Sequence, residues 1–150
     1  MKNAMRTMPR VLIVDDHEAF GQKCKQSLKS GFDVVGLLQN GSDIALAVTE
    51  LKPDVLVTDV SLARLNGFAL GELAKTIRPA MKVIYMTAAP ECDGALAALQ
   101  QGGSAYVSKL LFPGELLVAM RYVLRGDFYL TRRATLSINA PSISAQTAVA

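Results

Sequence analysis

Short, almost continuous apolar runs alternate along this chain with stretches whose apolar residues recur every three or four positions. The runs occupy residues 11–14, 33–38, 54–59, 82–87 and 105–108. Runs of this length that are rich in β-branched residues and bounded by chain breakers predict buried β-strands. We therefore expect five strands.

Helical spacing fills the intervals between the runs. The predicted helices cover about residues 17–30, 43–52, 66–78, 92–101 and 113–125. In the third of them, the residues expected to face the core are Leu70, Leu73, Ala74 and Ile77.

Five strands that alternate with five helices through short connections predict an α/β fold. Because the strands are apolar on both faces, they are expected to form a doubly wound, five-stranded parallel sheet covered by helices on both sides. The second strand ends on Leu38, Gln39 and Asn40 and is expected at the edge of the sheet.

Residues able to handle metal or phosphate stand at the ends of the other four predicted strands. Asp15 and Asp16 follow the first strand, Asp59 closes the third, Thr87 closes the fourth, and Lys109 follows the fifth. In open parallel sheets, ligands bind beyond the carboxyl ends of the strands. We therefore expect these side chains to form one site.

Three clustered carboxylates are costly to hold together without a counter-charge. Two unit charges about 4 Å apart repel by roughly 4 kcal/mol at an effective dielectric near 20. Mg²⁺ prefers oxygen ligands and is usually bound by one or two carboxylates together with phosphate oxygens. Asp15, Asp16 and Asp59 fit that preference and predict a Mg²⁺ site.

The same residues suit phosphoryl transfer. A carboxylate beside Mg²⁺ can act as the nucleophile that forms an aspartyl phosphate, and the reaction depends mainly on positioning and charge neutralisation. Lys109 would supply a positive charge to the phosphoryl group, and the Thr87 hydroxyl could donate a hydrogen bond to it.

Composition favours one ordinary folded domain. The chain has 150 residues, of which 51% are hydrophobic and 19% charged, and its net charge of +3 is too small for a nucleic-acid footprint. Cys24 and Cys92 have no metal-ligand neighbours at zinc-site spacing. The sequence contains no signal-like stretch and no apolar segment of the ~20 residues that a membrane span needs, so a cytoplasmic protein without membrane contact is expected.

Four segments carry a family resemblance, namely residues 11–18, 53–59, 83–88 and 103–109. Together they resemble the receiver domain of the response regulators of bacterial two-component systems. The Asp-Asp-His sequence at 15–17 and the ending at 125–130 are most similar to the NarL/FixJ (LuxR-type) group. The resemblance covers residues 9–130, which we expect to be the receiver domain, and leaves 131–150 as a linker or flexible tail.

The resemblance implies a flavodoxin-like strand order of 2-1-3-4-5 and a role for each site residue. Asp59 would be the phosphoacceptor for a sensor histidine kinase or phosphotransfer protein. Mg²⁺ would be held by Asp15, Asp16, Asp59 and the backbone carbonyl of Ser61. Thr87 and Tyr106 would form a switch pair, whose aromatic ring turns inward, and Lys109 would bind the phosphoryl group.

The family also implies a signalling domain rather than an enzyme, although one that assists its own phosphorylation and dephosphorylation. Phosphorylation adds about −1.5 to −2 charges, and such a change can bias a partner-binding or dimerisation surface. A homodimer is one expected assembly. Direct contact with nucleic acid is not expected, because residues 131–150 are too short and irregular for a helix-turn-helix.

Two places depart from the family pattern. Ala63 and Arg64 stand where the family usually has Pro and Gly, so this loop is expected to be looser and to bring a second cation near the site. Arg64 could face solvent, or reach the phosphoryl group and change its lifetime. The apolar residues 110–112 follow Lys109, where related receivers tend to be polar, and could either fill the core or form an exposed patch.

Other functions remain open at this point. The chain could be the receiver half of a DNA-binding transcriptional regulator whose helix-turn-helix is missing here, or a receiver that binds partners without phosphorylation. A hydrolase of the haloacid-dehalogenase type is disfavoured, because it needs a second Asp two positions after its nucleophile and His17 stands there. A nucleotide-binding role is disfavoured because no glycine-rich loop follows the first strand.

Overall fold

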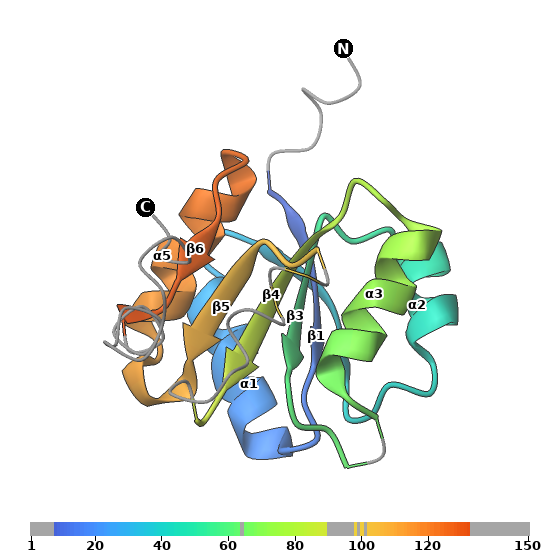
Figure 1. Cartoon of the computed structure of the whole chain (residues 1–150), viewed down its shortest axis with the longest axis horizontal. Helices are drawn as coiled ribbons and strands as arrows, with labels where there is room; N and C mark the ends of the chain where they lie inside the picture. Colours follow the sequence, from blue (N-terminus) through green and yellow to red (C-terminus); the bar gives the residue numbers. More distant parts are fainter. Residues whose placement is uncertain (1–7, 64, 90–97, 99, 101, 133–150) are drawn as a thin grey trace.

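The structure, a computed structural model, describes residues 8–63, 65–89, 98, 100 and 102–132. One parallel sheet runs through this part of the chain (Figure 1). Its strands are β1 (Arg10–Val14), β2 (Asp33–Leu38), β3 (Val55–Asp59), β4 (Lys82–Thr87), β5 (Ala105–Ser108) and β6 (Tyr129–Leu130).

The order of the strands is β2-β1-β3-β4-β5-β6, and every neighbouring pair is parallel. The predicted order and the edge position of β2 are confirmed. The predicted count of five strands was wrong, because β6 pairs with β5 through Ala105 and Tyr106. A strand of two residues is too short to produce a detectable period in the sequence.

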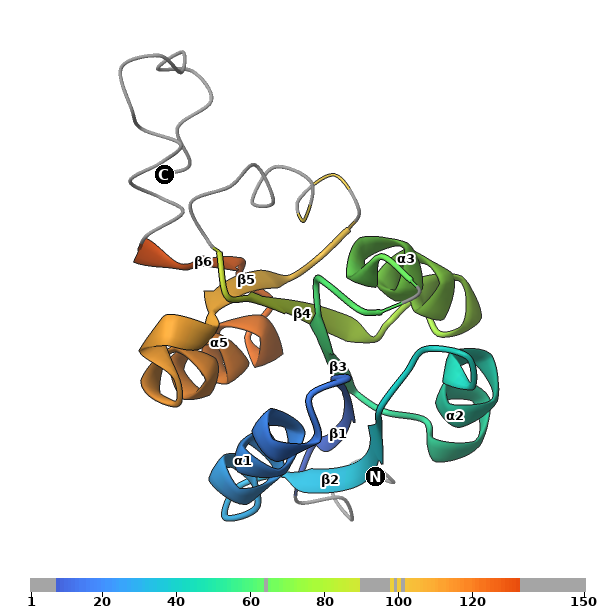
Figure 2. The same cartoon turned by 90° about the horizontal axis from the view of Figure 1, so that it is seen from below.

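Helices cover both faces of the sheet. They are α1 (Glu18–Leu28), α2 (Ile44–Leu51), α3 (Gly67–Ile77) and α5 (Gly114–Leu124), with a short 3₁₀ helix, η2 (Lys109–Leu111), after β5. Viewed end-on, α1 and α5 lie on one face and α2 and α3 on the other (Figure 2). The helix predicted at 92–101 falls mainly outside the described residues.

Strand side chains alternate between two apolar layers, which explains why both faces of the strands are hydrophobic. In β1, Val11 and Ile13 pack on the α1 and α5 side, whereas Leu12 and Val14 pack on the α2 and α3 side. All four are at most 1% exposed. These layers hold the strand ends, and therefore the side chains that follow them, in a fixed arrangement.

One helical face differs from its prediction. Leu70 and Ala74 of α3 are buried, as expected, but Leu73 and Ile77 are 47% and 37% exposed. They follow the helical period, yet the buried stripe of α3 runs instead through Gly67, Phe68, Leu70, Gly71 and Ala74. None of the helices in the described ranges is both long and apolar enough to cross a bilayer.

Candidate functional site at the carboxyl edge of the sheet

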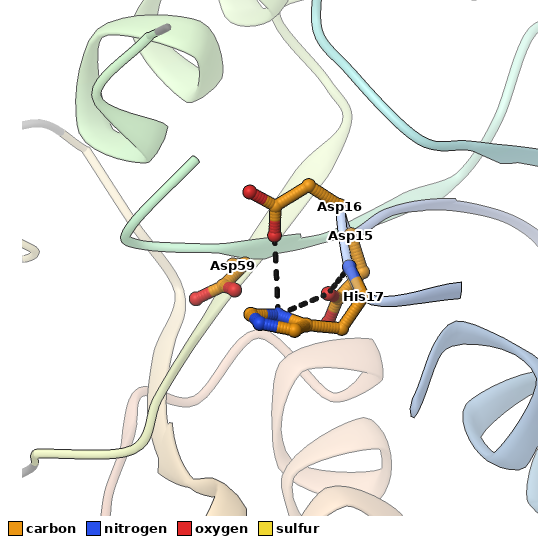
Figure 3. A group of neighbouring side chains, drawn as sticks. All are labelled: Asp15, Asp16, His17 and Asp59. Atoms are coloured by element: carbon orange, nitrogen blue, oxygen red, sulfur yellow. Dashed lines mark hydrogen bonds and ion pairs between the residues drawn. The ribbon is translucent and has the colours of Figure 1, made fainter. Parts of the chain in front are cut away.

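The parallel register of β1 and β3 brings the aspartates together. Val14 pairs with Thr58, so the next residues along the two strands, Asp15 and Asp59, are neighbours. Asp16 and His17 complete the group, and one ligand atom from each of the four residues lies within 4.8 Å of all the others (Figure 3). The predicted acidic cluster therefore exists as a geometric feature.

Lys109 bridges two members of this cluster. Its Nζ lies 2.9 Å from Asp15 Oδ2 and 2.9 Å from Asp59 Oδ2, and donates a hydrogen bond to each. The lysine side chain is only 12% exposed, and its Nζ also lies 4.5 Å from the centroid of the Phe20 ring. This cation–π contact and the two ion pairs fix the ammonium group over the carboxylates.

Burial and charge have opposite effects on the pKa values of Asp59 and Lys109. Burial raises the pKa of Asp59 above its ordinary value, and the hydrogen bond and charge of Lys109 only partly offset it. Burial alone would lower the pKa of Lys109, but its hydrogen bonds to Asp15 and Asp59 outweigh that effect and raise it. The ammonium is thus stabilised, while the Asp59 carboxylate stays poorly solvated.

The donor set fits a hard divalent cation. Three carboxylates and one ammonium leave a formal charge of −2, which a divalent ion would neutralise. Asp16 Oδ1 is buried without a hydrogen-bond partner, and the imidazole Nδ1 of His17, 3.2 Å away, forms an ion pair with it only when protonated. A buried carboxylate oxygen without a donor is costly unless a cation is bound.

His17 and Phe20 were not predicted as members of the site. His17 directly follows Asp16 in the loop after β1, and this adjacency was a usable signal in the sequence. Phe20 lies in the first turn of α1, where its spacing with Cys24 and Leu28 indicates only a core position. Its contact with Lys109 depends on tertiary packing.

The proposed switch residues sit on the neighbouring strands. Thr87 ends β4, one position beyond Met86, which pairs with Asp59. Its side-chain oxygen accepts a hydrogen bond from the Ala89 N–H at 3.0 Å, which leaves the hydroxyl proton available to donate. Tyr106 of β5 is 1% exposed and packs in the layer beside α2 and α3, so its ring faces inward.

The loop after β3 is held against Asp59. The Ser61 N–H donates to Asp59 Oδ1 at 3.2 Å. The backbones of Ser61 and Asn66 form an isolated antiparallel β-bridge across the loop. A Cβ on Gly67 would lie 2.0 Å from the Asp59 carbonyl oxygen, so this close approach requires glycine. The carbonyl ligand predicted at Ser61 stays a prediction.

Of the two loop residues that depart from the family pattern, the structure describes Ala63 but not Arg64. Ala63 is exposed and, together with Leu62 and Leu65, lines an open hollow of about 530 Å³ that also contacts residues 40–42. Arg64 lies outside the described residues, so both of its possible roles stay predictions.

The apolar corner after Lys109 divides between the two predicted alternatives. Phe112 packs into the layer beside α1 and α5, with its ring centroid 4.9 Å from that of Phe20. Leu110 is 58% exposed. One residue therefore fills the core while the other adds apolar surface beside the site.

A doubly wound parallel sheet with aspartates and a lysine at its carboxyl edge defines a receiver-like α/β domain. A sequence model described as "Response regulator receiver domain" matches residues 11–121. The chain therefore belongs to the response regulator receiver family, a family of signalling domains.

Known relatives agree with this assignment. The chain is 31% identical over 136 residues to a putative transcriptional regulator of Pseudomonas aeruginosa, covering 90% of this chain and 66% of that protein. It is 38% identical over 122 residues to a protein-glutamate methylesterase/protein-glutamine glutaminase of Myxococcus xanthus, covering 79% of this chain and 34% of that protein. The chain thus spans only part of each of these longer relatives.

The fold also matches solved structures. A LuxR-family two-component response regulator from Aurantimonas sp. superposes with a TM-score of 0.79 at 24% identity, covering 87% of this chain and 95% of that one. The match therefore supports the fold of the chain.

Proposed function

We propose that Asp59 accepts a phosphoryl group from a sensor histidine kinase or a phosphotransfer protein. The observation that carries this proposal is the placement of Lys109, whose ammonium lies 2.9 Å from both Asp15 and Asp59. A lysine shared in this way can stay paired with Asp15 while it binds a group added to Asp59. Burial of Asp59 limits access of water to the product.

The chemical step is a displacement at phosphorus. A carboxylate oxygen of Asp59 attacks the phosphorus of a phosphohistidine on the donor, and a P–O bond forms as the P–N bond breaks. The imidazole nitrogen leaves with the bonding electron pair and takes a proton from solvent. Lys109 offsets the negative charge on the transferred oxygens, which is the main requirement for this reaction.

A bound Mg²⁺ would neutralise charge on the phosphoryl oxygens and orient them. Asp15, Asp16 and Asp59 would hold the ion, with the Ser61 carbonyl as a further ligand. The buried Asp16 oxygen that lacks a hydrogen bond supports this assignment.

Phosphorylation would then act as a switch. The new group carries about −1.5 to −2 charges, which would attract the Thr87 hydroxyl and Lys109. We propose that Thr87 reports the phosphoryl group to Tyr106 on the adjacent strand, and that Ala63 and Arg64 tune its lifetime. The readout would be a changed partner-binding or dimerisation surface.

The assignment can be tested by incubating the chain with Mg²⁺ and acetyl phosphate, followed by intact-mass measurement. We expect one phosphoryl adduct on the parent, none on Asp59→Asn, and a strong reduction when EDTA replaces Mg²⁺. Asp127→Asn is a matched control, because Asp127 is exposed and far along the chain from the site. An unmodified parent, or an Asp59→Asn variant modified as fully as the parent, would contradict the proposal.

The output of the domain is a separate part of the proposal. Because a transcriptional regulator is among the relatives and the chain covers 66% of it, a receiver that controls a DNA-binding domain is a second candidate. In both cases we propose that residues 9–130 act in the cytoplasm as a signalling unit without enzymatic turnover of their own. Residues 131–150 would then serve as the linker.

A further inference from the structure

Glu115 is a buried carboxylate that the proposed phosphorylation chemistry does not use. It stands in the first turn of α5 and is 8% exposed. Its Oε1 accepts a hydrogen bond from the Ser108 N–H at 3.0 Å. Its Oε2 accepts from the Tyr129 hydroxyl at 2.9 Å, the Thr131 hydroxyl at 2.8 Å and the Arg132 N–H at 3.3 Å.

All four partners of Glu115 are donors. An ionised carboxylate only accepts hydrogen bonds and has about four lone-pair positions, so the surroundings are built for the charged form. The start of a helix also favours a negative charge. Burial, followed by the hydrogen bond to Glu115, raises the pKa of Tyr129, which keeps its hydroxyl protonated as a donor.

These hydrogen bonds join the end of β5, next to the candidate site, to the segment that follows β6. On one side, Ser108 immediately precedes Lys109, whose ammonium contacts Asp15 and Asp59. On the other side, Thr131 and Arg132 are where the chain leaves the sheet after β6. Thr131 is fully buried, and its N–H also donates to the Tyr106 carbonyl at 2.8 Å.

We propose that Glu115 couples the position of Lys109 to the chain segment that leaves the domain at residues 131–132. The coupling rests on the proposed phosphorylation of Asp59. When Lys109 turns to the phosphoryl group, the end of β5 shifts, and the Glu115 carboxylate transmits the shift to Tyr129, Thr131 and Arg132. Glu115 is thus a positioning residue for Lys109 and for the segment at residues 131–132.

The test measures amide hydrogen exchange at Thr131 and Arg132 by NMR, with the full chain in its free form and with beryllofluoride and Mg²⁺ as a stable substitute for the phosphoryl group. In the parent we expect the loaded form to change exchange at these amides by roughly fivefold, the factor that corresponds to one hydrogen bond. In Glu115→Gln this difference should vanish, because the amide offers too few acceptor positions for four donors.

Two milder variants keep the test informative if Glu115→Gln does not fold. Thr131→Val and Tyr129→Phe each remove one donor on the exit side and leave the Ser108 bond intact. Thr49→Val and Tyr122→Phe are their controls. Thr49 is exposed, and its hydroxyl donates to the Ala45 carbonyl within α2. Tyr122→Phe removes a hydroxyl from a 37% exposed residue of α5 but keeps the ring that packs edge-on against Tyr129. The exit-side variants should reduce the response to loading, and the controls should not.

A purely structural role gives a different result. If Glu115 only stabilises the fold, the variants should raise amide exchange by the same factor in the free and loaded forms. Variants that respond to loading as strongly as the parent would therefore overturn the proposal. A parent whose exit amides ignore loading would also overturn it.

A second arm requires no phosphoryl group. Lys109→Ala should alter exchange at Thr131 and Arg132 in the parent background but not in the Glu115→Gln or Thr131→Val backgrounds. This arm separates the two proposals: failure of the parent to load would count against phosphorylation at Asp59, whereas an unchanged exit segment in Lys109→Ala would count against the coupling.

Discussion

At the residue scale, the site depends on a lysine shared between two aspartates. Burial, with a smaller contribution from the charge of Asp15, raises the pKa of Asp59, and Lys109 offsets this only in part. A carboxyl group whose pKa is higher in the folded than in the unfolded state destabilises the fold when it is ionised. The ionised Asp59 carboxylate therefore lowers the stability of the fold unless a cation compensates its charge.

Replacement of Asp59 by asparagine should reveal this cost. Without Mg²⁺ at pH 7, Asp59→Asn should melt at the same temperature as the parent or a few degrees higher. Between the unfolded pKa and the raised folded pKa, the native state binds more protons, so the parent loses stability as pH rises through that window. The difference between variant and parent should therefore shrink as pH falls toward the unfolded value of about 3.8.

Thermal melting of both chains in EDTA across acidic to neutral pH checks this expectation. A large loss of melting temperature in Asp59→Asn would mean that Asp59 stabilises the fold, and that the acidic cluster does not carry the repulsion described above.

At the scale of elements, the connection from β3 to α3 decides how Asp59 is presented. The bridge between Ser61 and Asn66 closes the loop, and the Asn66 side chain caps α3 by accepting from the Phe68 N–H. Gly67 then passes so close to the Asp59 carbonyl that no side chain fits. The start of the helix is thus pressed against the end of the strand.

Gly67→Ala should therefore disturb both stability and chemistry. The added methyl group meets backbone atoms rather than a flexible side chain, so we expect a loss of roughly 1–3 kcal/mol in the free energy of unfolding. Phosphorylation by acetyl phosphate should slow as well, because the Ser61 N–H would move away from Asp59. Denaturant unfolding and intact-mass time courses measure the two effects.

Gly31→Ala is the matched control for this substitution. A Cβ at Gly31 would meet nothing within 4 Å, so its stability should change by no more than about 0.5 kcal/mol. Equal effects of the two substitutions would show that the contact with Asp59 is not what constrains Gly67.

At the scale of the whole molecule, the two core layers bury most of the large apolar side chains in the described residues, and a few remain exposed. Leu110 is 58% exposed and directly follows Lys109. If Asp59 is phosphorylated as proposed, an exposed apolar side chain next to Lys109 would be well placed to respond to the change in charge. The strand β6 pairs with β5, and Glu115 hydrogen-bonds to Ser108 at the end of β5 and to Thr131 after β6.

We expect the chain loaded with beryllofluoride and Mg²⁺ to self-associate more strongly than the free chain, and Leu110→Ser to weaken that association by about tenfold or more. The reason is the loss of one buried leucine, worth about 1.5–3 kcal/mol. Analytical ultracentrifugation over a concentration series measures it.

Leu46→Ser is the control, since Leu46 on α2 is exposed to the same extent, 58%. An equal effect of both substitutions, or a drop in melting temperature for Leu110→Ser alone, would contradict a surface role for Leu110.

The sequence by itself determined the order of strands and helices, the parallel sheet and the residues at the strand ends. Asp15, Asp59, Thr87 and Lys109 could be placed together because strand ends in a parallel sheet share one edge, which follows from local patterning alone. The same reasoning could not detect β6, whose two residues show no period, nor the outward positions of Leu73 and Ile77, which depend on where neighbouring helices pack.

Only the tertiary structure decided which side chains touch. The pairing of Lys109 with both Asp15 and Asp59, the contact of Phe20 with that lysine, and the gathering of four donors around Glu115 join residues distant in sequence. Such contacts arise from packing and burial, which alternation and spacing do not encode. The sequence therefore indicated which residues form the candidate site, and the fold supplied the contacts that set its charge balance and join it to the rest of the chain.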